Sequence, residues 1–165
     1  MFSKVYIRTS GNPILFIFLE EKQMSIKMRV LYDSGKPKIR NIANEIKAKY
    51  DLGVNAVDTI PPAYSCDKER IVILMISAKG DVKDSIRLFC QELTKARAQN
   101  IALIIDGDKA AANRIREIIG ESAGNRVYEE ILYIKGGFPI FGTAIKPEER
   151  TQIFEWVDRV LANLK

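Results

Sequence analysis

Two continuous apolar runs constrain the fold of this chain more than any other feature of its sequence. Residues 70–76 read RIVILMI and residues 101–105 read IALII, and neither run alternates polar with apolar side chains. A strand of this kind is typically buried on both faces, as at the centre of a parallel sheet. Because parallel strands are joined by crossover connections that are usually helices, the two runs predict an α/β domain.

The sequence around these runs alternates between strand-like and helix-like segments from Met28 to the end. Besides the two runs, we expect strands at residues 29–33, 54–57 and 131–134. Apolar residues at three- and four-residue spacings predict helices between the strands and after the last one. Five strands alternating with helices predict three layers, with helices on both faces of a parallel sheet. The apolar faces of the four predicted helices begin at Ile39, Ile86, Ala111 and Ile153.

Composition agrees with one such domain in a reducing compartment. The chain has 165 residues, of which 47% are hydrophobic and 28% charged, so disordered, collagen-like and coiled-coil chains are excluded. Histidine is absent, which excludes histidine triads, histidine-ligated zinc and histidine acid–base relays. The two cysteines, Cys66 and Cys90, are far apart and cannot build a disulfide framework, so we expect a cytoplasmic protein.

The charge balance does not point to nucleic acid. Lysine and arginine number 26 and aspartate and glutamate 21, which gives a formal charge of +5. The basic residues are mixed with acidic ones along every predicted helix, and aromatic residues do not interleave with a basic stripe. We therefore expect no nucleic-acid partner.

The first 27 residues stand apart from the alternating pattern. Their apolar run at residues 14–19 is too short to cross a bilayer, and charged residues rather than a cleavage site follow it, so we expect neither a membrane span nor a signal peptide. Two interpretations stay open: this extension forms a hairpin, or the given start is over-long and Met24 or Met28 is the true one. The predicted domain covers residues 28–165.

The turn after the first strand carries the chemistry of an anion site. Residues 33–38 read DSGKPK and lie directly before and at the start of a predicted helix. Ser34 offers a hydroxyl, and Lys36 and Lys38 offer positive charges. The positive dipole end of the helix also favours phosphate at this point. Gly35 lets the backbone approach a ligand closely. The turn lacks the glycine spacing of a P-loop and of a dinucleotide fingerprint. The alternative is an ordinary polar turn with solvated lysines.

The segment VLYDSGKPKI at residues 30–39, followed by IANEI at 42–46, resembles the opening strand, phosphate loop and first helix of the flavodoxin family. The strand at 71–77, the strand and turn at 101–108 and the segment IKGGF at 134–138 are similar to later parts of these proteins. The resemblance covers nearly the whole chain outside the extension, and it depends on the order of the elements more than on sharp motifs.

This resemblance implies a flavodoxin-like sandwich with strand order 2-1-3-4-5 and non-covalently bound FMN. The phosphate would lie in the first loop and the isoalloxazine ring between the loops after the third and fourth strands. The implied activity is electron transfer, in which the protein tunes the flavin and passes electrons to an unidentified redox protein, rather than catalysis by a side chain. The implied FMN contacts are Ser34, Gly35, Lys36, Pro37, Lys38 and Ile39 for the phosphate, and Ser77, Ala78, Lys79, Gly80, Asp106, Gly107 and Asp108 for the ring.

Departures from the family pattern keep a second interpretation open. Lys36, Pro37 and Ile39 stand where the family has a hydroxyl, a glycine and a threonine, and Pro37 also removes an amide donor. The two loops expected beside the ring contain no aromatic residue. Replacement aromatics from neighbouring loops are Tyr64, Phe138 and Phe141. The alternative function is a non-redox interaction or regulatory module that kept the fold and lost the flavin.

Three aspartates at the carboxyl ends of predicted strands offer another chemistry. Asp33, Asp106 and Asp108 could hold Mg²⁺ if they were adjacent, in a pattern similar to response-regulator receivers. However, Ser77 stands where a receiver has its acceptor aspartate. Helix capping and turn formation are commoner roles for such aspartates, and we predict no metal site.

Overall fold

The computed structural model describes residues 26–33, 35–121, 126–136 and 142–164. Its strands all pair in parallel and form one sheet of order β2-β1-β3-β4-β5, with β6 also pairing with β4. The strands are β1 (Met28–Tyr32), β2 (Val57–Thr59), β3 (Glu69–Ala78), β4 (Ala98–Gly107), β5 (Arg126–Val127) and β6 (Leu132–Tyr133). The helices are α1 (Pro37–Lys49), α2 (Asp84–Glu92), α3 (Lys109–Glu121) and α4 (Pro147–Ala162), with a 3₁₀ turn η1 (Val54–Ala56). This arrangement confirms the predicted flavodoxin-like fold class.

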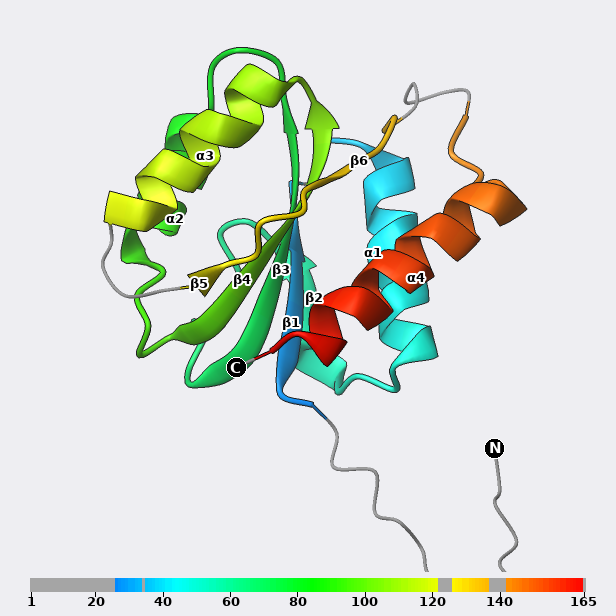
Figure 1. Cartoon of the computed structure of the whole chain (residues 1–165), viewed down its shortest axis with the longest axis horizontal. Helices are drawn as coiled ribbons and strands as arrows, with labels where there is room; N and C mark the ends of the chain where they lie inside the picture. The colour runs from blue at the N-terminus through cyan, green and yellow to red at the C-terminus, as the bar shows by residue number, and fades with distance from the viewer. Residues whose placement is uncertain (1–25, 34, 122–125, 137–141, 165) are drawn as a thin grey trace, which may run out of the picture.

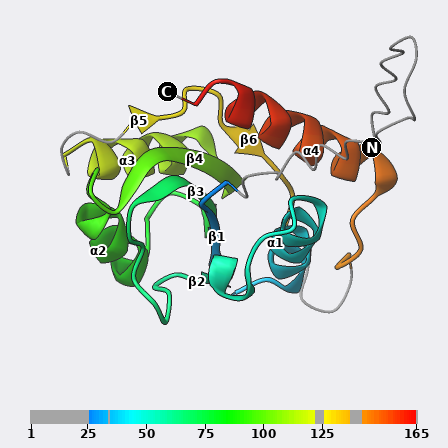
Figure 2. The ribbon, with the colours of Figure 1, turned by 90° about the horizontal axis from the view of Figure 1, so that it is seen from below.

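Helices cover both faces of the sheet, with α2 and α3 on one face and α1 and α4 on the other (Figures 1 and 2). Side chains along β3 alternate between the two resulting cores. Leu74 and Ile76 pack with the residues of α2 and α3, whereas Ile73 and Met75 pack with those of α1 and α4. All four side chains are fully buried, so the two-faced burial predicted for this run is confirmed.

The two central strands are longer than the apolar runs that predicted them. β3 and β4 each contain ten residues and pair from Glu69 with Ala98 to Ala78 with Gly107. The ladder therefore reaches from the amino edge, where the strands begin, to the carboxyl edge, where they end.

The outer strands differ from the prediction. Residues 54–56 form η1 rather than a strand, and Val54 is 86% exposed, so β2 begins only at Val57. The predicted strand at 131–134 is only part of the last sheet position. β6 covers two of its residues, and β5, which was not predicted, pairs with an earlier part of β4. Exposed Glu129 and Glu130 lie between the two short strands, where burial against β4 would strip their carboxylates of water.

Local contacts fix the positions of three side chains in the fold. Trp156 of α4 is fully buried and donates from Nε1 to the Glu130 carbonyl over 3.2 Å. Cys90 of α2 is buried in the core, and burial raises the pKa of its thiol to about 12. Asp108 Oδ1 accepts from the Ala111 amide over 2.8 Å and so caps α3. No helix in the described part of the chain is long and apolar enough to cross a bilayer.

Candidate functional site

The turn between β1 and α1 lies at the carboxyl edge, where the strand order reverses between β1 and β3. The Asp33 amide donates to the Met75 carbonyl over 2.9 Å, which continues the β1–β3 pairing to the end of β1. Lys83, which directly precedes α2, donates to both Asp33 carboxylate oxygens, over 2.9 and 2.8 Å. Asp33 is buried, so this ion pair fixes the turn after β1 against the loop after β3.

Asp106, at the end of β4, is the centre of a second set of contacts. Its Oδ2 accepts from Lys36 Nζ and from Ser77 Oγ, and its Oδ1 accepts from the Gly136 amide over 2.9 Å. We call Lys36, Ser77, Asp106 and Gly136 the Asp106 cluster. It joins the turn after β1 to the ends of β3 and β4 and to the segment after β6.

The electrostatics of this cluster keep Asp106 ionised. The residue is only 8% exposed, and burial alone would raise the pKa of its carboxyl. The hydrogen bonds from Lys36, Ser77 and Gly136, with the positive charge of Lys36, outweigh burial and lower that pKa. Asp106 is therefore a carboxylate at neutral pH, and Lys36 supplies its counter-charge.

Close packing also requires glycine at two positions of this edge. A Cβ at Gly136 would collide with the Asp106 carboxylate and lie 2.8 Å from Lys36 Cδ. A Cβ at Gly107 would collide with the Ala78 carbonyl. The cluster and the β3–β4 ladder thus leave no room for side chains at these two points.

The second lysine of the turn is buried in an ion pair with the last helix. Lys38 is 8% exposed, and its Nζ lies 2.8 Å from a carboxylate oxygen of Glu149 on α4. Ile39 is fully buried in the core. Neither side chain is turned toward a ligand at the carboxyl edge.

The backbone at the start of α1 is partly committed to the helix itself. Pro37 is the first helical residue and carries no amide hydrogen. The Ile39 amide donates to the Lys36 carbonyl over 3.1 Å. Gly35 is exposed, and a Cβ there would make only ordinary contacts. Ser34, predicted to contact the phosphate, lies outside the described residues.

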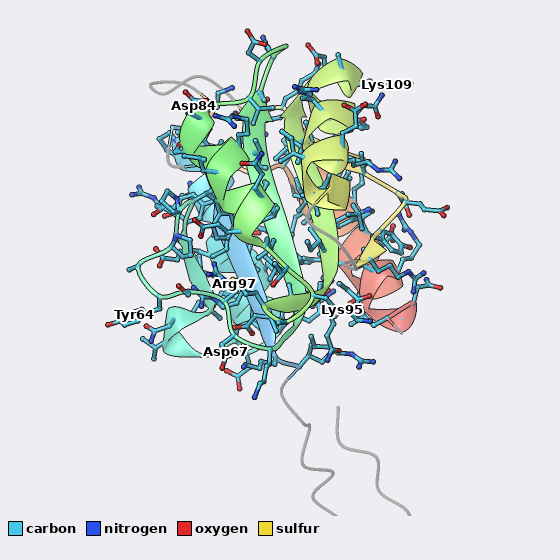
Figure 3. The ribbon with its side chains drawn as sticks, turned by 90° about the vertical axis from the view of Figure 1, so that its left-hand side faces the viewer. Tyr64, Asp67, Asp84, Lys95, Arg97 and Lys109 are labelled. Atoms are coloured by element: carbon cyan, nitrogen blue, oxygen red, sulfur yellow. The ribbon has the colours of Figure 1, made fainter. Side chains whose placement is uncertain are left out.

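The loops predicted to flank an isoalloxazine ring begin in direct contact with each other. Ser77 and Ala78 belong to β3, Asp106 and Gly107 belong to β4, and the two strands stay paired to their last residues. Asp108 caps α3, and Lys79 and Gly80 are exposed. Tyr64 lies at the opposite end of the molecule from Asp84, as Figure 3 shows, so it does not supply the missing aromatic. Phe138 and Phe141 lie outside the described residues.

The three aspartates do not form a metal site. Asp33 is paired with Lys83, Asp106 with Lys36, and Asp108 caps α3. Within the described ranges, no group of three or more histidine, cysteine, aspartate or glutamate residues could hold a metal ion. The structure brings lysines rather than further carboxylates to Asp33 and Asp106.

Sequence reasoning missed the partners that complete this edge. Lys83 and Glu149 lie far along the chain from the turn residues Asp33 and Lys38 that they contact, and Gly136 follows Asp106 by 30 positions. The position of Lys83 directly before a helix at the same edge was a signal, but nothing in the sequence specifies that Glu149 on the last helix meets Lys38.

Comparison with known proteins does not identify a function for this chain, so a functional proposal has to be argued from the contacts described above. A scan against protein-family models, a search of curated proteins and a search of solved structures give no significant match.

Proposed function

We propose that this chain is a non-redox interaction or regulatory module that has the flavodoxin-like fold and does not bind FMN. The observation that carries the proposal is the pairing of the cations around the turn. Lys36, Lys38 and Lys83 each contact a carboxylate of the chain itself. No net positive charge remains on these three pairs to attract a phosphate.

Binding a phosphate through Lys36 would require its separation from Asp106. The Asp106 carboxylate would then be a buried charge without its counter-ion, which costs about 3–5 kcal/mol when a partner is removed. A phosphate would have to supply that free energy in addition to its own desolvation. The Asp106 cluster therefore disfavours a phosphate at the turn.

The flavin ring would also lack its usual support. The described residues of the two ring loops include no aromatic side chain, and the β3–β4 ladder stays closed up to Ala78 and Gly107. These features support a surface that is complete without a cofactor.

The same contacts suit the proposed role. One carboxylate holds the ends of β3 and β4, the turn after β1 and the segment after β6 in a single arrangement. Pre-organised loops reduce the entropy that is lost on association. The carboxyl edge can therefore present a fixed surface to a partner molecule.

Titration of the purified protein with FMN tests this proposal. We expect no saturable quenching of flavin fluorescence and no rise in melting temperature at saturating FMN. Saturable FMN binding that raises the melting temperature would overturn the proposal.

FMN binding is the second candidate, and the position of the turn favours it. The turn after β1 lies beside β3, at the switch point where open α/β sheets commonly bind ligands. Under this candidate Lys36 would exchange Asp106 for the phosphate. Replacing both Lys36 and Lys38 with alanine should then weaken FMN more than riboflavin, whereas Lys95→Ala, at the opposite edge (Figure 3), should change neither.

A further inference from the structure

Arg29 is a buried cation under the loop that joins β2 to β3. It pairs in register with Val72 of β3, which belongs to the core that α2 and α3 cover, so the Arg29 side chain lies on that face of the sheet. The residue is only 7% exposed, and one guanidinium nitrogen donates to the Tyr64 carbonyl over 3.2 Å. Among the described residues, its buried Nε has no hydrogen-bond partner and Arg29 makes no ion pair. Because buried charges are normally paired, this position favours a negative charge beside the guanidinium.

The loop over Arg29, residues 60–68, contains no helix and turns one nucleophile inward. Tyr64 and Asp67 are exposed, whereas Cys66 is only 3% exposed and packs in the core that α2 and α3 cover. Figure 3 shows Tyr64 and Asp67, which stand on either side of Cys66 in the sequence, at the same end of the molecule. The Cys66 thiol and the Arg29 guanidinium therefore lie under the same surface loop.

The charges around Cys66 favour an anion at its sulfur, although burial opposes one. Burial raises the pKa of the Cys66 thiol, so the resting group is neutral at neutral pH. The positive charge of Arg29 is the strongest influence that lowers this pKa, and Arg97 and Lys27 act in the same direction. The negative charge of Glu69 raises it. Arg29 therefore stabilises the thiolate, and equally any other anion formed at this sulfur.

Cys90 provides an internal comparison for this thiol. It is fully buried within α2, and burial raises the pKa of its thiol to about 12. Cys66 differs in lying on a loop and in having Arg29 as a cationic neighbour. Because reactive thiols are found in electropositive surroundings, Cys66 is the more reactive of the two.

We propose that Cys66 is an oxidation site, at which hydrogen peroxide converts the thiol to a sulfenate whose negative charge is neutralised by Arg29. The cation that the fold buries without an ion pair then gains a counter-ion that is formed within the chain itself. Arg29 belongs to the amino edge, whereas the Asp106 cluster lies at the carboxyl edge. The oxidation site is therefore separate from the proposed functional surface.

The reaction starts from the small thiolate fraction of Cys66. After the thiol has lost its proton to solvent, the sulfur attacks one oxygen of hydrogen peroxide and the O–O bond breaks. The second oxygen leaves as hydroxide, which takes the proton of the sulfenic acid and becomes water. Sulfur loses two electrons and the peroxide gains them. Only Ile60 and Cys66 of the loop are buried, so local opening of this loop can admit a molecule as small as hydrogen peroxide.

Treatment with hydrogen peroxide at pH 8 in the presence of dimedone, which traps sulfenic acids, tests the site. Peptide mass spectrometry follows the labelling of Cys66 and Cys90 in the same molecules. We expect Cys66 to be labelled about tenfold faster than Cys90 or more, because its thiolate is the better stabilised of the two. Equal rates at the two cysteines would overturn the proposal.

Arg29→Met tests the role of the guanidinium. It should slow the labelling of Cys66 about threefold or more, because the smaller thiolate fraction outweighs the higher nucleophilicity of a more basic thiolate. A general loosening of the fold would instead speed the labelling of both cysteines, so the Cys90 rate reports on the fold. Arg70→Met is the matched control, because Arg70 is exposed on β3 and contacts Gln99, and it should leave the Cys66 rate unchanged.

Glu69→Gln should change the Cys66 rate in the opposite direction. Glu69 is the first residue of β3, and removing its negative charge should speed the labelling of Cys66 while the Cys90 rate stays the same. This variant also decides the matter if Arg29→Met does not fold. The proposal is overturned if a folded Arg29→Met does not slow the labelling of Cys66, or if Glu69→Gln does not speed it.

Discussion

The two ends of the sheet treat buried charge in opposite ways. At the carboxyl edge, Asp106 receives three donors and Asp33 receives two hydrogen bonds from Lys83. At the amino edge, Arg29 is buried to a similar degree and has one carbonyl partner. Ligands of open α/β sheets usually bind at the carboxyl ends of the strands. In this chain that end is completed by its own side chains, and the unmet charge lies at the other end.

The largest expected effect comes from removing the carboxylate at the centre of the paired edge. Asp106→Ala leaves Lys36 without its counter-ion and the Ser77 hydroxyl and Gly136 amide without an acceptor. We expect a loss of about 3 kcal/mol in the free energy of unfolding, measured by urea denaturation. The control is Asp84→Ala: among the described residues, exposed Asp84 forms an ion pair only with Arg87 one turn away, so this substitution should cost little. Equal stability of the two variants would contradict the structural importance of the cluster.

A methyl group at the same edge should have the next largest effect. Gly136→Ala would force a Cβ against Asp106 and Lys36, at a cost of about 2 kcal/mol. Gly120 of α3 has no atom within 4 Å of its would-be Cβ, so Gly120→Ala should instead add up to about 1 kcal/mol through helix propensity. Chemical denaturation of both variants compares them, and a stabilising Gly136→Ala would mean that the cluster is loosely packed.

Two of the ion pairs between α1 and α4 allow the coupling energy of a buried pair to be compared with that of an exposed pair. A double-mutant cycle with Lys38→Met and Glu149→Leu should give a coupling of about 1–2 kcal/mol, because both side chains are largely buried. Arg150 and Glu45 join the same helices in a bidentate pair that is much more exposed. Their coupling should be clearly smaller, and the opposite order would show that burial does not govern these contacts.

At the amino edge, removing a buried charge should not lower the free energy of unfolding as it does at Asp106. Arg29→Met removes a buried charge that has no ion-pair partner in the described part of the chain, and it keeps a side chain of similar length. Unfolding experiments should find the variant within about 1 kcal/mol of wild type or more stable. A loss as large as that of Asp106→Ala would show that the guanidinium holds the fold and that the two edges do not differ in this respect.

The smallest effect concerns pH. The pKa of Asp106 is lower in the folded than in the unfolded chain, where an aspartate has a pKa of about 3.9. Its contribution is therefore complete above that value and is lost as the pH falls through the folded-state pKa. The stability difference between wild type and Asp106→Ala, followed by urea denaturation from pH 7 to pH 3, should stay constant at first and shrink below about pH 4. A difference that grows with acidification would contradict the lowered pKa.

The sequence predicted the parts of the fold that carry strong, local patterns. The apolar runs of β3 and β4 indicate burial on both faces, and helical spacing located the cores of α1 to α4. β2, β5 and β6 contain only two or three residues each, too few for a periodic pattern to emerge. Their limits depend on pairing with a neighbour, which a single sequence does not encode locally.

The candidate site was predicted in position but not in its contacts. The turn at 33–38 lies at the expected switch point. However, its two lysines pair with carboxylates that are separated from them in the sequence by 70 positions (Lys36 and Asp106) and by 111 positions (Lys38 and Glu149). Such long-range ion pairs have no signature in sequence spacing. The sequence did carry a signal for Arg29, because a charged residue within the otherwise apolar strand MRVLY indicates a buried charge.

The shortness of the outermost strands bears on how copies of this chain meet. β2 forms one border of the sheet with three residues, and β5 and β6 divide the other into two pieces of two residues. A foreign strand needs a long row of free amides and carbonyls to extend a sheet. The long, strongly apolar β3 and β4 pair with each other at the centre and are flanked by other strands, so the segments most prone to amyloid-like stacking are shielded from other copies of the chain in the folded state.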